Sequence, residues 1–364
     1  MPLPQEKHPE LPLPAAIPNG NLARLRAAFA DPWRKPLLRV FLELAEAAFR
    51  TRGIPRYYVK HLLYRADAAN WRDYLTPREG RRISSFNRNR SRIPFLENKL
   101  LFHYHFREAD VRLPVCLGYS IGPVFFSDEG PRLLSSPDDL LRLGEALLSR
   151  TGSAGVFAKP IGGIHGKRCL RLDSASLQPE QVENYYADVC SGSFVFEEAL
   201  VQHALLSSIY PHSVNTLRFI TWTHRDGTIQ VVSALLRLGA SGSCTDNASA
   251  GGLFLKVDLE SGALAPYARK FYEFGGTVHF AHPDTGFEFS GFDVPDFDSA
   301  LEMTKVAAAH LPYCLVGWDV AITPDGPVLI EGNHNPHIYG AEIADGGYKK
   351  NPVFRAFLRE VGIH

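Results

Sequence analysis

The sequence predicts an α+β protein in which a helical N-terminal region precedes a larger part built from strand pairs. Between Leu22 and Tyr74, apolar residues recur at spacings of three and four, as in amphipathic helices. Further along, the strand-like segments Val214–Thr223 and Ile229–Leu238 flank a turn, and so do Leu315–Thr323 and Pro327–Gly332. The periodicity therefore changes from helical to strand-like along the chain.

The composition is that of an ordinary soluble protein with room for two or three domains in 364 residues. The 39 Lys and Arg residues balance 39 Asp and Glu residues, so the overall charge favours no class of partner. The proline-rich N-terminus lacks the apolar region of a signal peptide, and no run approaches the roughly 18 apolar residues of a membrane span. Because the five cysteines form no CxxC pair, we expect reduced thiols in a cytoplasmic protein.

Positive charge is concentrated between Arg50 and Arg92, where twelve Lys and Arg residues stand against three acids. One interpretation is a docking surface for an anionic partner, such as a carrier, a lipid surface or a charged glycan. The other is a solvated helix face, or arginines that pack against acids elsewhere in the chain. We favour the second and expect no nucleic-acid partner, because aromatic residues and nucleic-acid motifs are weak in this window.

A hairpin near the C-terminus combines an apolar face with a cluster of oxygen ligands. If Pro324-Asp325-Gly326 forms a three-residue loop, Asp319 lies across from Glu331, and Asn333 joins them on the same face. The other face then carries a core set consisting of Trp318, Val320, Ile322, Val328 and Ile330. Carboxylate and amide oxygens suit Mg²⁺, so the hairpin predicts a metal site. Two alternatives are a surface hairpin whose acids face water, and a two-residue turn that separates the acids.

Cationic side chains precede this hairpin in three separate segments. Lys99 lies in a helix that begins near Pro94, and Lys159 ends a short apolar strand. Glycines follow Lys159, and their backbone N–H groups can approach phosphate oxygens; they are Gly162, Gly163 and Gly166. Arg218 lies on an apolar strand, where its burial requires either a bound anion or an internal acid.

Further candidates lie in segments that are irregular or rich in small residues. Phe194–Gln202 resembles a strand that ends in an irregular edge, where backbone groups framed by apolar side chains can recognise an adenine. Asn247 lies in a flexible loop that can approach a ligand or the metals. His334 and His337 follow the expected metal ligands closely, and we expect them near a substrate.

These residues occur in an order that resembles the ATP-grasp enzymes. The order is Lys99, Lys159 before a glycine loop, Glu197-Glu198 at a strand end, Arg218, and then Asp319 with Glu331-x-Asn333. The segments QH at 202–203, SVNTLRFIT at 213–221 and GWDVAITPDGPVLIEGN at 317–333 resemble the sugar-transfer-associated branch of that superfamily. The resemblance covers about residues 90–360 and leaves the N-terminal helical region outside.

The resemblance implies an ATP-grasp fold, in which two α+β subdomains clamp ATP between antiparallel sheets, with an N-terminal helical extension. The N-terminal arm and helical region would occupy residues 1–92, and the ATP-grasp N-terminal part residues 93–155. The lid subdomain would occupy residues 156–203 and the C-terminal catalytic subdomain residues 204–364.

The resemblance also assigns roles to the candidate residues. Lys99 and Lys159 would hold ATP phosphates beneath the glycine loop, and Arg218 would neutralise the transferred phosphoryl group. The adenine would contact the backbone of Phe196, Glu197, Glu198, Ala199 and Leu200, with Glu197 or Glu198 at its amino edge or at the ribose. Gln202 or His203 stands where such enzymes place a ribose-binding acid, which is a departure from the family pattern. Asp319, Glu331 and Asn333 would ligate two Mg²⁺ ions.

The implied activity is that of an ATP- and Mg²⁺-dependent carboxylate–amine ligase with small-molecule substrates. A carboxylate would attack the γ-phosphorus to give an acyl phosphate, and an amine would then form the amide, with Lys159 and Arg218 screening the charge. Two alternatives remain open. One is a phosphotransferase that uses the same nucleotide site, and the other is a nucleotide-binding regulatory protein of a surface-polysaccharide pathway.

Overall fold

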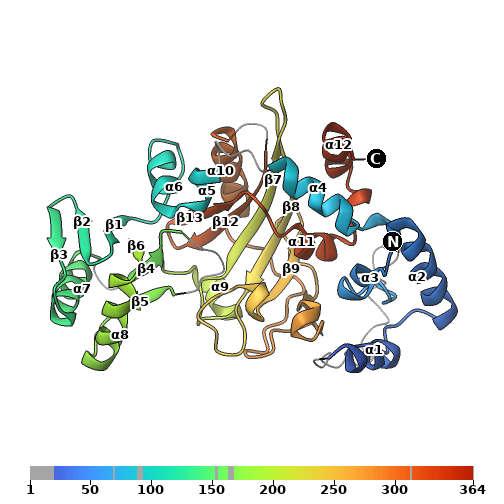
Figure 1. The fold of residues 1–364 in the computed structure, drawn as a ribbon, viewed down its shortest axis with the longest axis horizontal. Coiled ribbons are helices and arrows are strands. Elements are labelled where there is room, and N and C mark those ends of the chain that lie inside the picture. The colour runs from blue at the N-terminus through green and yellow to red at the C-terminus, as the bar shows by residue number, and fades with distance from the viewer. Residues whose placement is uncertain are drawn as a thin grey trace.

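The computed structural model describes residues 20–68, 70–87, 93–151, 155–162, 168–311 and 314–363. Helices of the N-terminal region lie at one end of the molecule, a small sheet lies at the other end, and a larger sheet lies between them (Figure 1). No helix in these ranges is long and apolar enough to cross a membrane. The proline-rich N-terminal arm expected before residue 20 lies outside the described residues.

The N-terminal region is helical, as predicted, and shares a hydrophobic core with the C-terminal part of the chain. Tyr58, Leu63 and Trp71 belong to the same buried cluster as Trp222 and Tyr348. The region is therefore packed onto the larger sheet. Its elements are α1 (Asn21–Ala30), α2 (Leu37–Thr51), α3 (Arg56–Lys60), η1 (Trp71–Asp73) and α4 (Pro77–Asn87).

Part of the arginine-rich segment packs against acids, as the second interpretation expected. Arg65 Nε lies 2.7 Å from Asp31 Oδ2, and both side chains are buried. Arg72 Nε donates to Glu46 Oε1 at 2.8 Å on the surface. These arginines therefore fasten the N-terminal helices to one another.

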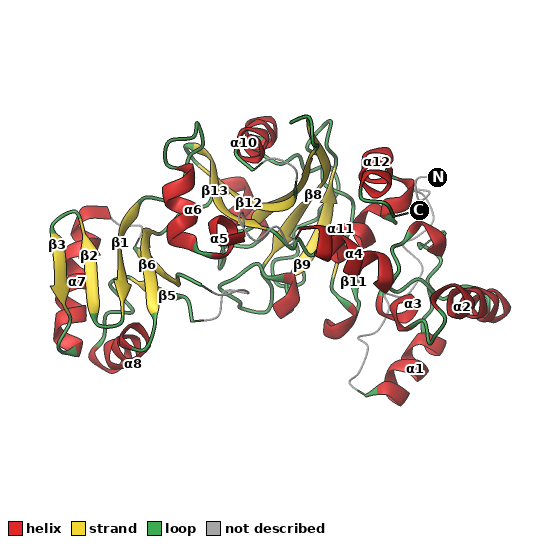
Figure 2. Cartoon of the chain, turned by 45° about the horizontal axis from the view of Figure 1, so that its top comes forward, coloured by secondary structure: helices red, strands yellow, loops and turns green. Residues whose placement is uncertain are grey.

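The small sheet has six strands in the order β3-β2-β1-β6-β4-β5. The helices α7 (Pro137–Thr151) and α8 (Pro179–Cys190) pack against it through a shared apolar core (Figure 2). Because β6 pairs with both β1 and β4, the expected boundary between residues 155 and 156 runs through one sheet. Its strands are β1 (Cys116–Ile121), β2 (Val124–Ser127), β3 (Gly130–Leu133), β4 (Val156–Pro160), β5 (Leu170–Leu172) and β6 (Ser193–Glu198).

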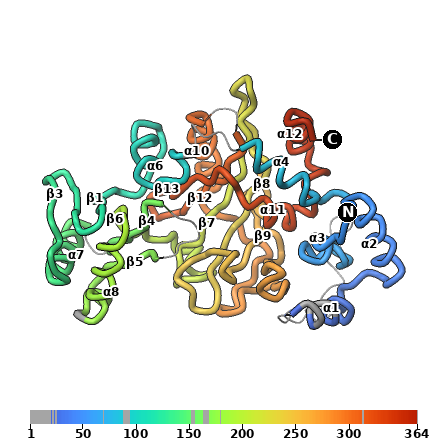
Figure 3. The backbone as a smooth tube through the Cα atoms, in the orientation of Figure 1, coloured from blue at the N-terminus to red at the C-terminus, as the bar shows by residue number. Residues whose placement is uncertain are grey.

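The large sheet has seven strands in the order β11-β10-β9-β8-β7-β12-β13, and every neighbouring pair is antiparallel. Its strands are β7 (Thr216–Thr223), β8 (Ile229–Leu238), β9 (Leu253–Val257), β10 (Ala268–Arg269), β11 (Val278–His279), β12 (Leu315–Thr323) and β13 (Gly326–Asn333). Two separate parts of the chain lie at this sheet. The helices that precede β1 lie against it, and the segment that follows β6 forms it (Figure 3).

Two apolar cores cover opposite faces of the large sheet. One contains residues of α6 (Lys99–Phe106) and α10 (Phe297–Ala309), and the other contains residues of α11 (Ile338–Asp345), α12 (Pro352–Glu360) and the N-terminal helices. Shorter elements fill the connections, namely α5 (Ile93–Glu97), α9 (Ala204–Ile209), η2 (Ala248–Ala250), η3 (Tyr272–Phe274) and η4 (Tyr348–Lys350).

The β12–β13 hairpin corrects the predicted turn but keeps the predicted alignment of the acids. Thr323 pairs with Gly326, so the loop has two residues and not three. A register shift next to Asp319 then adds one residue to β13, and Asp319 still lies across from Glu331. A β-bulge has this effect, because two residues of one strand oppose one residue of the other.

The bulge makes the predicted faces of β13 wrong. Leu329, which strict alternation along β13 would place on the face of Glu331 and Asn333, lies opposite Val320 and packs in the core with Trp318. Val328, which we placed in that core, lies opposite Ala321 on the other face. Ile330, at the shift, is half-buried.

Candidate functional site

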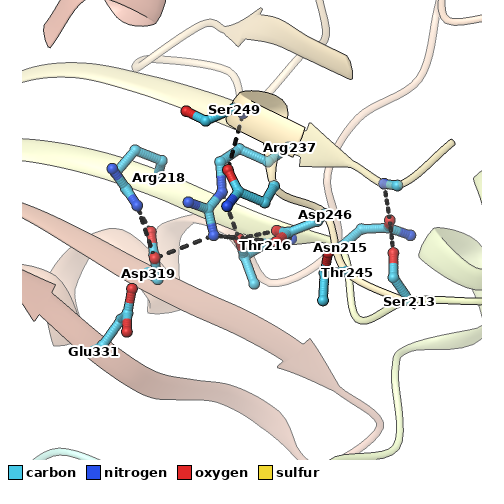
Figure 4. A network of polar contacts seen from close by, with 12 residues as sticks. Ser213, Asn215, Thr216, Arg218, Arg237, Thr245, Asp246, Ser249, Asp319 and Glu331 are labelled. Atoms are coloured by element: carbon cyan, nitrogen blue, oxygen red, sulfur yellow. Dashed lines mark hydrogen bonds and ion pairs between the residues drawn. The ribbon is translucent and has the colours of Figure 1, made fainter. Parts of the chain in front are cut away.

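Arg218 and Asp319 form a two-point ion pair on neighbouring strands of the large sheet. The register of β7 and β12 places them directly opposite each other. Arg218 Nη2 donates to Asp319 Oδ2 at 2.8 Å, and Nε donates to Oδ1 (Figure 4). Paired hydrogen bonds of this kind are among the strongest between side chains. We expected Arg218 to pair with either a bound anion or an internal acid. The structure shows an internal acid, Asp319, which is also the expected metal ligand.

Arg237 on β8 joins Asp319 to a second buried acid. Its Nη2 lies 3.1 Å from Asp319 Oδ2 and 3.2 Å from Asp246 Oδ1, and it donates to Thr216 Oγ1 at 2.8 Å. Burial acts to raise the pKa of Asp319, but the charges of Arg218 and Arg237 outweigh burial and lower it to about 2. Asp319 is therefore ionised at neutral pH.

Sequence reasoning missed Arg237, Asp246 and Thr216. A signal for Arg237 existed, because it is an arginine on an apolar strand, as Arg218 is. Burial raises the pKa of Asp246 although Arg237 opposes the shift. Asp246 accepts a hydrogen bond from the backbone N–H of Thr216 at 3.0 Å, which ties its loop to β7.

Glu331 and Asn333 complete the cluster of oxygen ligands. Glu331 lies across from Asp319, and Asn333 Nδ2 donates to Glu331 Oε1 at 3.2 Å. Burial raises the pKa of Glu331, and the neighbouring charge of Asp319 raises it further. A cation at this position would relieve the repulsion between the two carboxylates.

The donor chemistry of this cluster fits Mg²⁺. Among the described residues there is no group of three His, Cys, Asp or Glu side chains with a metal-binding arrangement. Magnesium usually needs only one or two carboxylates, because substrate phosphates and waters supply its other ligands. Asp319, Glu331 and the amide oxygen of Asn333 meet that requirement.

Lys159 reaches the site from the small sheet. Its Nζ lies 2.6 Å from Glu197 Oε2, and both side chains are almost completely buried. Burial acts to lower the pKa of Lys159, but the Glu197 carboxylate outweighs burial, and Glu331 also acts to raise the pKa. Lys159 therefore stays charged, and it interacts electrostatically with Glu331 of the large sheet.

Lys99 lies beside the end of the same strand. It is the first residue of α6, whose start is capped by the side chain of Asn98. The backbone N–H of Lys99 donates to Ile161 O at 2.9 Å, and Asn98 pairs with Gly162. The charge of Lys99 acts to lower the pKa of Glu331. Both predicted lysines therefore act electrostatically on Glu331. Gly163 and Gly166 lie outside the described residues.

The segment expected to contact adenine ends β6 at the junction between the two sheets. Phe196 is buried in the core of the small sheet, and Glu197 holds Lys159. The N–H groups of Glu198 and Ala199 donate at 2.9 Å to Val115 O and Gly155 O respectively. Leu200 follows in a half-buried position.

Gln202 and His203 have structural partners. Gln202 Oε1 accepts from the Asn215 N–H at 2.6 Å, and its Nε2 donates to Tyr210 O at 3.1 Å. His203 Nδ1 accepts from the Leu205 N–H at 3.2 Å and caps α9. Their role at a ribose stays a prediction.

The expected substrate residues lie at two places beside the cluster. Asn247 directly follows Asp246, and its Oδ1 accepts from the Ser249 N–H at 2.9 Å. His334 follows Asn333, with its Nε2 3.5 Å from Glu97 Oε1 of α5. His337 is exposed at the start of α11.

Solved structures of similar fold include enzymes described as a synthase and a synthetase. One is carboxyaminoimidazole ribonucleotide synthase from Aspergillus clavatus complexed with ATP, at 12% identity and a TM-score of 0.41, with 67% of this chain and 46% of that chain covered. Another is D-alanyl-alanine synthetase A from Vibrio cholerae, at 10% identity and a TM-score of 0.44, with 73% and 63% covered. The chain thus spans less than two thirds of the length of either protein. Neither description names a carrier or a glycan.

No curated protein matches the chain in sequence. A family model described as "Sugar-transfer associated ATP-grasp" matches residues 79–351, which is most of the chain and includes every candidate site residue from Lys99 to His337. The chain therefore belongs to the sugar-transfer-associated ATP-grasp family.

Proposed function

We propose that this protein is an ATP-dependent ligase that joins a small-molecule carboxylate to an amine and releases ADP and phosphate. The observation that carries the proposal is that Lys99 and Lys159 both act electrostatically on the Glu331 carboxylate, which lies across from Asp319, in a member of an ATP-grasp family. An anionic nucleophile and a triphosphate repel each other, and their reaction needs cations held in place.

The two lysines would bind phosphate oxygens. Lys159 is already held in place by Glu197, so its ammonium group loses little conformational freedom when a phosphate arrives. Arg218 directs Nε and Nη2 to Asp319, and its Nη1 is the group that would neutralise the transferred phosphoryl group. Arg237 would hold Asp319 in position from the other side.

Asp319, Glu331 and Asn333 would hold Mg²⁺, whose charge would screen the phosphates and orient them for attack. Binding would require an ionised Glu331, and the nearby charge of Lys99 favours that form. The count of two ions stays a prediction.

The proposed reaction has two steps. A carboxylate oxygen of the substrate attacks the γ-phosphorus, the bond between that phosphorus and the β–γ bridging oxygen breaks, and ADP leaves with the electron pair. The amine nitrogen then attacks the acyl carbon, phosphate leaves, and the nitrogen loses a proton. A dry site favours the second step, because water competes with the amine for the acyl phosphate.

An ADP-release screen over pooled carboxylates and amines tests this function. A ligase releases ADP only when both substrates are present, and the product mass equals their sum minus one water. Asp319→Asn should slow turnover about 100-fold or more, whereas Asp325→Asn, at an exposed position in the same hairpin, should retain it.

Two other results would replace the proposal. ADP release without an amine, together with a phosphorylated product, would identify a phosphotransferase. Nucleotide binding without turnover over the whole screen would favour a regulatory role.

A further inference from the structure

The helix α2 has its apolar face turned toward the solvent. Leu38 is 72% exposed, Phe41 69%, Leu42 58% and Phe49 85%. At about 100° per residue these positions fall within an arc of roughly 100°. The usual arrangement of a surface helix places such a stripe against the core.

The opposite side of α2 is anchored by polar contacts. Glu43 is buried there and accepts hydrogen bonds from Lys35 Nζ at 2.9 Å and from the Tyr58 hydroxyl at 2.6 Å. Val40 and Ala47 are buried on the same side. The helix is therefore fixed in an orientation that presents its aromatic and leucine side chains outward.

The exposed stripe lies at the end of the molecule away from the small sheet, where no other part of the described chain covers it (Figures 1 and 2). The stripe continues into Ile54, just past the helix, which is 80% exposed. It is also remote from the carboxylate cluster on β12 and β13. A partner can therefore bind this end without blocking the candidate active site.

Positive charge lies beside the C-terminal end of the stripe. Residues 20–87 contain fourteen Lys and Arg residues and six Asp and Glu residues, so this part of a neutral chain carries a formal charge of +8. Arg50, Arg52 and Arg56 alternate with Phe49 and Ile54 along the chain, and all three arginines are exposed. The acids near them are engaged, since Glu43 is buried and Glu46 bonds to Arg72 and Arg50.

This charge decides between the possible occupants of the stripe. A two-fold contact with a second copy would bring together two surfaces that both carry an excess of positive charge, and such surfaces repel. An anionic lipid surface attracts the arginines and accepts the apolar side chains at its boundary with the acyl chains. An amphipathic helix needs no membrane-spanning length to bind in this way.

We propose that α2 is a peripheral membrane-binding helix that places Leu38, Phe41 and Phe49 at the surface of an anionic phospholipid bilayer. The proposal does not depend on the ligase function, because the lipid-binding residues and the carboxylate cluster lie in separate parts of the fold.

Co-sedimentation of the full-length protein with vesicles tests this proposal. We expect partition onto vesicles of phosphatidylcholine with about 30% phosphatidylglycerol, little partition onto pure phosphatidylcholine, and a decrease as NaCl rises from about 0.05 to 0.5 M. The double substitution Phe41→Ser and Phe49→Ser should reduce partition about tenfold or more, because it removes the apolar contacts.

A matched control uses exposed apolar residues at the other end of the molecule. Ile121 and Leu133 are 56% and 60% exposed in the small sheet, and their double substitution by serine should leave partition unchanged. Thermal unfolding should be similar for both variants, since all four side chains are exposed.

Three outcomes would overturn the proposal. The first is no partition of the wild-type protein onto anionic vesicles, and the second is an equal loss in the Ile121/Leu133 control. The third is a wild-type dimer in light scattering that the Phe41/Phe49 variant converts to a monomer, which would assign the stripe to a second copy.

Discussion

Replacing Glu342 by glutamine should flatten the dependence of folding stability on pH. Glu342 lies in α11 with 1% of its surface exposed, at the junction with the N-terminal helices. One carboxylate oxygen accepts from the Leu75 N–H at 2.6 Å, and the other lies 3.8 Å from His61 Nδ1. Burial raises the pKa of Glu342 to about 8, although hydrogen bonds from the backbones of Leu75 and Tyr348 oppose the shift.

The sign and size of the effect follow from this pKa. Since the value in the folded protein exceeds the ordinary 4.5, the folded state binds the proton more tightly than the unfolded state does. The resulting stability is fully present below about pH 4.5 and is lost as the pH rises through about 8. At about 1.4 kcal/mol for each pH unit in this window, the wild type should lose about 2–3 kcal/mol relative to Glu342→Gln between about pH 6 and 8.

Urea unfolding followed by circular dichroism at several pH values measures this difference. Glutamine keeps the oxygen that accepts from Leu75, so the variant should fold. Glu302→Gln, at an exposed position of α10, is the control and should follow the wild-type profile. Parallel profiles for the wild type and Glu342→Gln would refute the reasoning.

Three further predictions concern the hairpin and the candidate site. Leu329→Ala should cost about 2–5 kcal/mol of folding stability in urea unfolding, because it opens a cavity in the core, whereas Ile330→Ala should cost less; equal losses would contradict the bulged register. Lys159→Ala leaves the Glu197 carboxylate buried without a counter-charge and should cost about 3–5 kcal/mol, most of which the added substitution Glu197→Leu should restore. Asp319→Asn should slow ADP release about 100-fold or more in a coupled assay, and a rate within a factor of about two of wild type would exclude Asp319 from the reaction.

Local patterns in the sequence predicted many of the elements. The bounds of β8 and β12 are those expected, and β7 begins two residues after its predicted start at Val214. The periodicity that defines such elements depends on neighbours along the chain, so it can be read from sequence alone. The same reasoning missed α8, α9 and α11, although α8 begins with Pro179 and has Glu180 in its first turn, and α11 ends at Gly346, which are helix start and stop signals.

The candidate site was predictable in its residue types but not in its pairing. An arginine on an apolar strand must find an anion, and sequence reasoning left open whether that anion is a ligand or an acid of the protein. The answer is Asp319, which is 101 residues away along the chain. Arg237 and Asp246 were overlooked because their contacts arise when β7, β8 and a following loop come together.

The sequence by itself determined the set of chemical groups and their order along the chain. The family pattern from Lys99 to Asn333 consists of individual residues in a fixed order, so it can be recognised from the sequence alone. The tertiary structure decided which faces those groups share. A two-residue turn alone would have separated Asp319 from Glu331, and the bulge in β13 brings them together again. Strand register depends on packing across the sheet, and that information is not contained in any one segment of the chain.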